Sequence, residues 1–274
     1  MHRKMALFPL ILAALLATPA ASDTGTADRG RELAEALDTK DKGYQDAVAK
    51  LTMIIRNSAG EETRRELTVK TLEQTNDGDY SLMRFEFPAD IRGTTLLTQP
   101  NHDGEDRQWL FMPSINRVKR ISSRNKSGPF VGSEFSFEDL SDHSVDDYEY
   151  QLLGKADCAL SLNNKDHEER RKNIQCERLE RIPKDKYSGY SKEILSVDPE
   201  HYRIVKIQYY DRKGSLLKVF STYRFKLFDN EYWRPLKVEM SNVQTGKTTE
   251  LHYDKLTFGT GLNNSDFHRS ALSH

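Results

Sequence analysis

Apolar and polar residues alternate with a period of two along much of this chain. Alternate positions are apolar over residues 51–55, a turn follows at 58–60, and the alternation resumes over 67–71. Such alternation is typical of strands that bury one face, so two runs around a tight turn predict a hairpin. Residues 80–87 predict a further strand with apolar side chains on both faces.

The second half of the chain predicts a meander of consecutive strands. Residues 211–214 (DRKG) form the first turn, with Gly214 at a position that needs a positive φ. Short connections make the sheet antiparallel, and its one apolar face must be covered by closure into a barrel or by helices. The predicted strands cover residues 204–210, 217–227, 236–240 and 249–253.

Two segments predict helices that could cover that face. Residues 28–37 place Leu33, Ala34 and Leu37 on one side at helical spacing. Residues 133–140, or as far as 143, follow an N-cap serine and carry acids in the early turns, which the helix dipole favours. The apolar surface of this second segment consists of Phe135, Phe137 and Leu140. The fold class is therefore mainly β with a few helices.

Residues 1–22 have the features of a secretory signal peptide. Two basic residues precede an apolar run over residues 5–17, and small residues follow over 18–22. Cleavage is predicted after Ser22 or after Ala21, and a retained membrane anchor is the alternative. Residues 23–274 then form one exported domain with no second apolar stretch of membrane-spanning length.

Composition narrows the class of protein. The chain is 36% hydrophobic and 30% charged, but its apolar residues are patterned, which argues against disorder. Its 41 basic and 42 acidic residues give a net charge of −1, so nothing favours a nucleic-acid partner.

Two cysteines, Cys158 and Cys176, flank a short and highly charged segment. In an oxidising exported compartment two cysteines usually pair, so a disulfide is expected between the flanking strands. Redox chemistry is not predicted, because the C-x-x-C spacing is absent.

No catalytic constellation is present. The densest group, His143 with Asp142, Asp146 and Asp147, is interpreted as a solvated acidic loop and not as a metal site. Nucleophile-elbow and dinucleotide-binding motifs are also missing. The sequence predicts a protein that is not an enzyme and uses no cofactor or metal.

A basic group lies within one predicted strand, at Arg117, Lys119 and Arg120. It is a candidate surface for anionic head groups or for an acidic partner. An ordinary strand edge protected by charge is the alternative, and the sequence leaves both open. Likewise Trp109, Phe111, Tyr223, Phe225 and Tyr253 are candidates either to line a cavity or to fill a packed core.

The segment over residues 90–140 resembles the outer membrane lipoprotein-sorting protein family, a branch of the LolA/LolB-like periplasmic carriers. The similar blocks are RGTTLL (92–97), WLFMP (109–113), RVKRI (117–121) and GPFVGSEFSFEDL (128–140). The hairpin at 204–214, the WRP motif at 233–235 and the tail at 258–267 are also similar. The cysteine pair and its charged loop have no place in the family pattern, and no match to the handover residues of the family's carriers is found.

The resemblance implies a strongly curved antiparallel sheet, a half-open barrel, wrapped around plug or lid helices. Its concave face would hold acyl chains in a hydrophobic cavity. Such proteins are carriers of lipids or lipoproteins across the periplasm, from the inner towards the outer membrane. Their partners include RND/MMPL-type or ABC exporters and an outer-membrane acceptor, and the carrier itself is expected to be a monomer.

Within that fold, we hypothesise that the predicted helix over residues 133–140 is the lid, with Phe135, Phe137 and Leu140 facing inward. Exposure of Phe135 and Phe137 on the outer surface would exclude this role. Trp109, Phe111, Tyr223 and Phe225 would face the cavity. An envelope adaptor with a packed core, acting through its surface beside an RND-type exporter, is the alternative function. An enzyme acting on envelope glycans or lipids is a third, and no residue constellation supports it.

Overall fold

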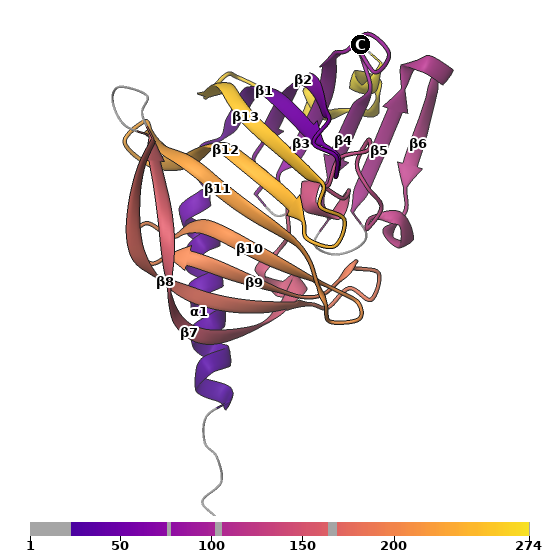
Figure 1. Ribbon diagram of the computed structural model, residues 1–274. Helices are drawn as coiled ribbons and strands as arrows, with labels where there is room; N and C mark the ends of the chain where they lie inside the picture. Colours follow the sequence, from indigo (N-terminus) through magenta and orange to yellow (C-terminus); the bar gives the residue numbers. More distant parts are fainter. Residues whose placement is uncertain (1–22, 76–77, 102–105, 164–168, 274) are drawn as a thin grey trace, which may run out of the picture.

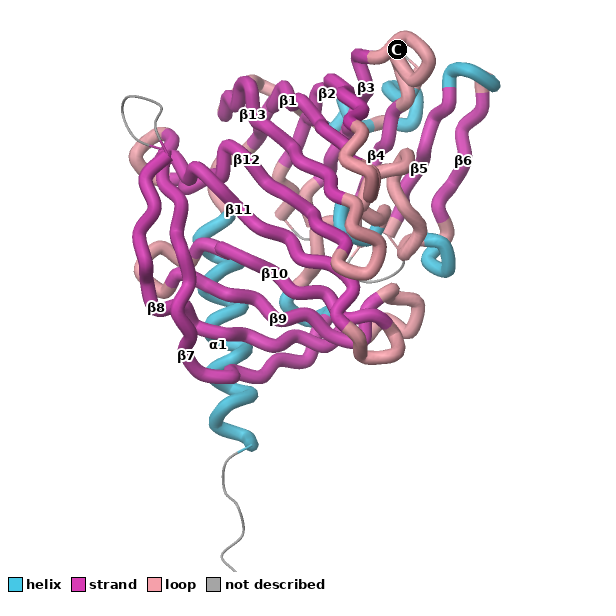
Figure 2. The backbone as a smooth tube through the Cα atoms, viewed as in Figure 1, coloured by secondary structure: helices cyan, strands magenta, loops and turns pink. Residues whose placement is uncertain are grey.

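Strands β1–β13 form one continuous sheet that curls around helix α1 (Figures 1 and 2). The structure is a computed structural model, which describes residues 23–75, 78–101, 106–163 and 169–273; the predicted signal peptide lies outside these residues. The elements are α1 (Asp23–Asp41), β1 (Asp46–Arg56), β2 (Glu62–Leu72), β3 (Tyr80–Phe87), β4 (Thr95–Gln99), β5 (Arg107–Met112), β6 (Arg117–Ile121), β7 (Tyr148–Asn163), β8 (Glu169–Pro183), β9 (Tyr190–Asp198), β10 (Arg203–Asp211), β11 (Leu216–Phe228), β12 (Tyr232–Asn242) and β13 (Thr248–Phe258). Short 3-10 helices cover Pro113–Ile115, Ser123–Asn125, Glu138–Leu140, Val145–Asp147, Asn264–Phe267 and Arg269–Leu272.

The sheet is almost entirely antiparallel, as predicted. Strands from β7 to β13 and from β1 to β6 pair in sequence order, and the two series join where β1 pairs with β13. One parallel bridge, Phe225 with Leu162, brings β7 against β11. The predicted hairpins are confirmed, including the turn at Gly214, whose φ is 81°. The result is a strongly curved open sheet, not a closed barrel.

Helix α1 extends beyond the predicted residues 28–37 at both ends. It lies against β7 and β8 inside the curve of the sheet (Figure 1). Close contact is possible because Gly30 has no side chain: a Cβ there would lie 3.1 Å from the backbone nitrogens of Gln151 and Leu152. The helix ends before Gly43, whose φ is 101°.

The prediction of a helix over residues 133–140 is wrong. Only Glu138–Leu140 forms a single 3-10 turn, and the preceding residues fold back on themselves through a bridge between Pro129 and Ser136. The Ser133 hydroxyl donates to the Phe130 carbonyl at 2.8 Å, and this bond belongs to a turn and not to a helix cap. Tertiary burial of the aromatic side chains therefore overrides the local helical signal.

Residues 128–140, the plug segment, insert these aromatic side chains into the main core. Phe130 stacks on Phe85 with ring centroids 5.7 Å apart, and Phe137 meets Phe130 edge-on at 5.8 Å. Phe135 packs edge-on against Phe220 of β11. All three plug phenylalanines are buried.

A second apolar cluster lies on the other face of β3–β5. Trp109, Phe111 and Leu97 pack there against Phe267 and Leu272 of the C-terminal segment. The neighbouring Leu110 points the opposite way into the main core, as strand alternation requires. This part of the sheet is thus covered on both faces.

The predicted disulfide is present between Cys158 and Cys176 on the paired strands β7 and β8, with Cα atoms 5.9 Å apart. Cys176 is fully buried against Leu160, Val205 and Phe225.

Replacing both cysteines by alanine is expected to lower the free energy of unfolding by about 3 kcal/mol, because the crosslink restricts the unfolded chain. Urea titration of the oxidised protein and of the double variant would measure this. An unchanged midpoint would show that the crosslink does not stabilise the fold.

Candidate ligand-binding cavity

A cavity of about 890 Å³ lies between helix α1 and the concave face of the sheet. Ala49, Val69 and Met83 occupy neighbouring positions on β1, β2 and β3 and form one row of its wall. Further apolar side chains come from α1, the plug segment and strands β8–β13. They include Leu37, Phe135, Leu140, Leu179, Leu195, Ile204, Phe220, Val238, Leu251 and Phe258. A volume and lining of this kind suit an apolar ligand.

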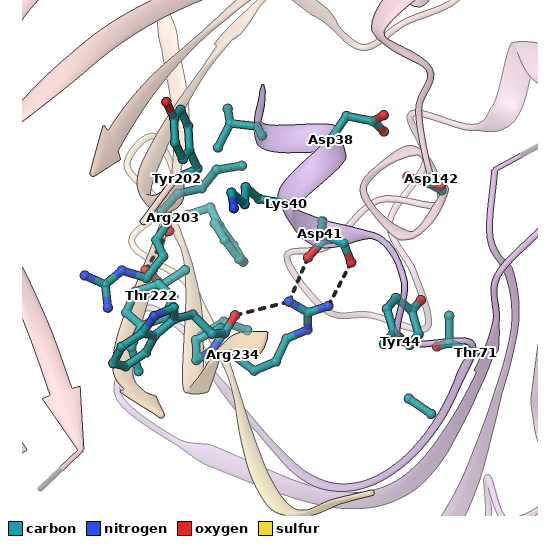
Figure 3. Close-up of a pocket in the computed structure, with 18 of the residues that line it drawn as sticks. Asp38, Lys40, Asp41, Tyr44, Thr71, Asp142, Tyr202, Arg203, Thr222 and Arg234 are labelled. Atoms are coloured by element: carbon teal, nitrogen blue, oxygen red, sulfur yellow. Dashed lines mark hydrogen bonds and ion pairs between the residues drawn. The ribbon is translucent and has the colours of Figure 1, made fainter. Parts of the chain in front are cut away.

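Polar side chains gather where the C-terminal end of α1 meets β12 (Figure 3). Arg234 pairs with the Asp41 carboxylate at 2.8 Å and donates to the Asp41 carbonyl at 3.1 Å. A cation here also interacts favourably with the helix dipole, since Asp41 is the last helical residue. This contact ties the end of α1 to the sheet.

Two other arginines that line the cavity are held by buried carboxylates. Arg181 donates from Nε and Nη2 to Glu193 at 2.9 and 2.6 Å. Arg203 donates from the same two nitrogens to Asp198 at 2.8 and 2.5 Å. Both guanidinium groups also lie over aromatic rings, Tyr148 for Arg181 and Trp233 for Arg203, each at 4.4 Å.

A buried ion pair fixes the plug segment at the cavity wall. The Lys218 ammonium lies 2.5 Å from Asp139, and their side chains are only 5% and 3% exposed. Tyr190 donates to the other Asp139 oxygen at 2.7 Å. Burial and the Asp139 charge raise the pKa of Tyr190, so its hydroxyl keeps its proton and remains a donor.

Glu138 anchors the same segment a second time. Its carboxylate accepts from the Gly189 backbone at 2.9 Å and lies 3.9 Å from the Lys126 ammonium. Burial raises the pKa of Glu138, whereas these contacts act in the opposite direction. The plug segment is therefore a fixed wall of the cavity.

An acidic group lies where the chain leaves α1 for β1. Glu73 accepts from the backbone nitrogens of Gly43 and Gln45, and the Tyr44 hydroxyl donates to Asp79 at 2.5 Å. Burial raises the pKa of Asp79 to about 6, and the charges of Asp142 and Glu73 add to this effect.

An Asp79→Asn variant is expected to be more stable than the wild type at about pH 7.5, with the difference shrinking towards about pH 5. The folded state holds the Asp79 proton more tightly than the unfolded state, so its contribution to stability is lost as the pH rises through about 6. Urea unfolding at the two pH values measures this. A difference independent of pH would contradict it.

The structure brings only part of the predicted cavity set together. Phe135, Leu140 and Phe225 line the cavity, whereas Phe137 is buried behind them against Phe130. Trp109 and Phe111 do not line it, because they face the second apolar cluster.

Tyr223 also lies outside the cavity lining, with the Lys237 ammonium 5.1 Å from its ring centroid. On β11 the cavity-facing positions change from Phe220 and Thr222 to Phe225 and Leu227. Arg224, whose φ is 58°, lies between these two pairs. Regular alternation would keep the odd-numbered residues of 217–227 on one face throughout, whereas in the first half of the strand the even-numbered residues face the cavity.

The basic residues Arg117, Lys119 and Arg120 lie exposed on β6, the strand at the end of the sheet. Ile115 and Val118 beside them are 61% and 39% exposed.

Arg234, Asp41 and Lys218 are not among the site residues that the sequence predicted. Arg234 belongs to the WRP motif, but its partner Asp41 is distant in sequence. Lys218 has only the signal of a charged residue inside an apolar strand.

Among the described residues, no cluster of three His, Cys, Asp or Glu side chains could hold a metal ion. No helix in the same residues is long and apolar enough to cross a membrane.

The curved sheet around a helix defines a LolA-like fold. A LolA superfamily protein from Nitrosomonas europaea matches it with a TM-score of 0.65 and 21% identity, covering 90% of this chain and 99% of that one. A DUF1329 family protein from Desulfovibrio piger gives a TM-score of 0.79 at 28% identity, covering 90% and 99%.

A domain assigned to outer membrane lipoprotein sorting from Vibrio parahaemolyticus is 40% identical, with a TM-score of 0.82, covering 90% of this chain and all of that one. The chain belongs to this outer membrane lipoprotein-sorting protein family, as its sequence resemblance indicated. Residues 77–274 also match a family profile described as uncharacterized protein-like. No protein of curated function matches the chain.

Proposed function

We propose that this protein is a periplasmic carrier that encloses acyl chains of a lipid or lipoprotein and moves them from the inner towards the outer membrane. The observation that carries the proposal is the cavity of about 890 Å³, lined by apolar side chains from both the sheet and α1. Transfer of one methylene from water into such a site is worth about 0.8 kcal/mol, so enclosure makes a soluble carrier effective. The similar domain from Vibrio parahaemolyticus is described as an outer membrane lipoprotein-sorting protein domain, which supports this role.

The covering element in this proposal is α1 and not the plug segment. The plug segment is pinned by the buried Lys218–Asp139 pair, whereas α1 is held to its surroundings by exposed pairs such as Arg31 with Asp146 at 2.6 Å. Exposed ion pairs contribute little to stability, so the cost of moving α1 lies mainly in its apolar packing, which includes Ala34 in the main core.

Delivery needs a partner, and the β6 edge is the surface that we propose for it. Arg117, Lys119 and Arg120 would attract an acidic surface, while Ile115 and Val118 would supply apolar contact. An exporter of the RND/MMPL or ABC type would donate the cargo, and an outer-membrane acceptor would receive it. The carrier would act as an exported monomer of residues 23–274, without enzymatic activity.

The test is to purify the full-length protein from the periplasm of an expressing cell and to extract it with organic solvent. We expect acyl lipid in the extract at close to one molecule per protein, and saturable binding of a fluorescent fatty acid by the delipidated protein. An empty extract together with no fatty-acid binding would overturn the proposal. Such a result would favour the envelope adaptor that works through its surface alone.

A further inference from the structure

Arginines of the cavity differ in how one edge of the guanidinium group is used. An arginine carries five N–H donors, and the edge formed by Nε and Nη2 matches a carboxylate or phosphate. In Arg181 and Arg203 this edge is filled, by Glu193 and by Asp198. These two residues show what chemistry the edge takes up in this protein.

On Arg234 the same edge is only partly used: among the residues that the structure describes, Nε has no protein partner and Nη2 has one. Its Nη1 group lies 2.8 Å from an Asp41 carboxylate oxygen and donates to the Trp233 carbonyl at 3.2 Å. Its Nη2 group donates once, to the Asp41 carbonyl at 3.1 Å. Figure 3 shows the two contacts to Asp41 on the side of the guanidinium group that faces α1. With respect to the described part of the chain, the Nε–H group and one N–H group of Nη2 remain available to a ligand.

The surroundings of Arg234 also favour binding of an anion, because aromatic rings lie around the guanidinium group and its side chain is largely buried. The rings of Tyr44, Tyr232 and Phe258 lie 5.4–5.7 Å from its Cζ atom. Its side chain is 19% exposed, so ion pairs there are less screened than at the surface. Its partner Asp41 is 71% exposed, unlike the buried carboxylates that hold the other two arginines.

We propose that the Nε/Nη2 edge of Arg234 binds the anionic head group, a carboxylate or a phosphate, of an amphiphile whose acyl chain occupies the cavity. This inference rests on the proposed function and adds a head-group specificity to it. The cavity that Arg234 lines is also lined by the apolar residues Leu37, Leu256 and Phe258, so the acyl chain can continue from the head group into the cavity. The Asp41 carboxylate would then lie close to the negative charge of the head group. Asp41 would therefore compete with the head group for Arg234.

The experiment compares two probes of equal chain length, hexadecanoate and the neutral hexadecanol, by displacement of a fluorescent fatty acid at about pH 8, where a carboxyl group is ionised. Arg234→Gln is expected to weaken hexadecanoate binding at least about tenfold, as expected for a lost charge-assisted contact, and to leave hexadecanol within about twofold. Asp41→Asn is expected to tighten hexadecanoate binding. Arg64→Gln, on the exposed part of β2, is the matched control and should change neither affinity.

The outcomes separate the inference from the proposed function. If neither probe displaces the dye from the wild type, the carrier function fails, and the inference with it. If both probes bind and neither Arg234→Gln nor Asp41→Asn alters hexadecanoate binding, the inference alone is overturned. Should Arg234→Gln fail to fold, the Asp41→Asn result still decides. Hexadecyl phosphate and inorganic phosphate are two further probes. If inorganic phosphate binds as tightly as hexadecyl phosphate, and Arg234→Gln abolishes its binding, the site takes a free anion and not a lipid head group.

Discussion

Replacing Lys218 with methionine is expected to lower the free energy of unfolding by about 3–5 kcal/mol. The substitution leaves the Asp139 carboxylate buried beside Tyr190 without its cation, 2.5 Å from where the ammonium lies. An isolated buried charge carries the full cost of desolvation, and the Glu134 carbonyl also loses the hydrogen bond that it accepts from Lys218 at 3.1 Å. Urea titration, monitored by tryptophan fluorescence, measures the free energy of unfolding of both proteins.

The control is the double variant Lys218→Met/Asp139→Asn. Removal of both charges should recover more than half of the lost stability, because asparagine can still accept from Tyr190 and needs no counter-ion. If Lys218→Met were as stable as the wild type, the plug segment would not depend on this pair, and its description as a fixed wall would be wrong.

Acyl binding should be lost when the cavity is filled. Val69→Trp places an indole in the row formed by Ala49, Val69 and Met83, in the middle of the cavity wall. We expect the affinity for a fluorescent fatty acid to fall at least about tenfold, since one tenfold step corresponds to only about 1.4 kcal/mol and several methylenes would be displaced.

A matched control lies on the same strand. Glu66→Trp introduces the same side chain at an exposed position of β2, where the Glu66 carboxylate pairs with the exposed Arg64. Its affinity should stay within about twofold of the wild type. Equal affinities for the two tryptophan variants would place the acyl site outside this cavity. Circular dichroism of both variants would show that the fold is retained.

The strands within residues 51–71 and 204–253 were predictable because apolar and polar residues alternate there. The segment over 133–140 was not, because its conformation is set by contacts from elsewhere: Phe220, Lys218 and Gly189 all lie far along the chain. Local helical signals of about two turns cannot compete with such burial.

The candidate site was harder to predict than the fold. Trp109 and Phe111 share an apolar face, but the sequence does not say which of the two covered faces encloses the cavity. Near Arg224 the cavity-facing positions of β11 change from even-numbered to odd-numbered residues. This change comes from the positive φ of Arg224, and the pattern of apolar and polar residues does not indicate it. Asp41 and Arg234 are single charged residues in a highly charged chain, and only folding brings them together.

The pairing of β1 with β13 has a consequence for how the molecule assembles. Met53 lies opposite Leu251, so the first strand has one of its two neighbours only after nearly the whole chain is available. Contacts between residues distant in sequence slow folding, because the loop between them must be closed first. The meander β7–β13 can form from local hairpins, whereas β1–β3 are expected to join it late. Completion of the cavity wall is therefore expected to be among the last steps of folding, when β1–β3 reach the rest of the sheet.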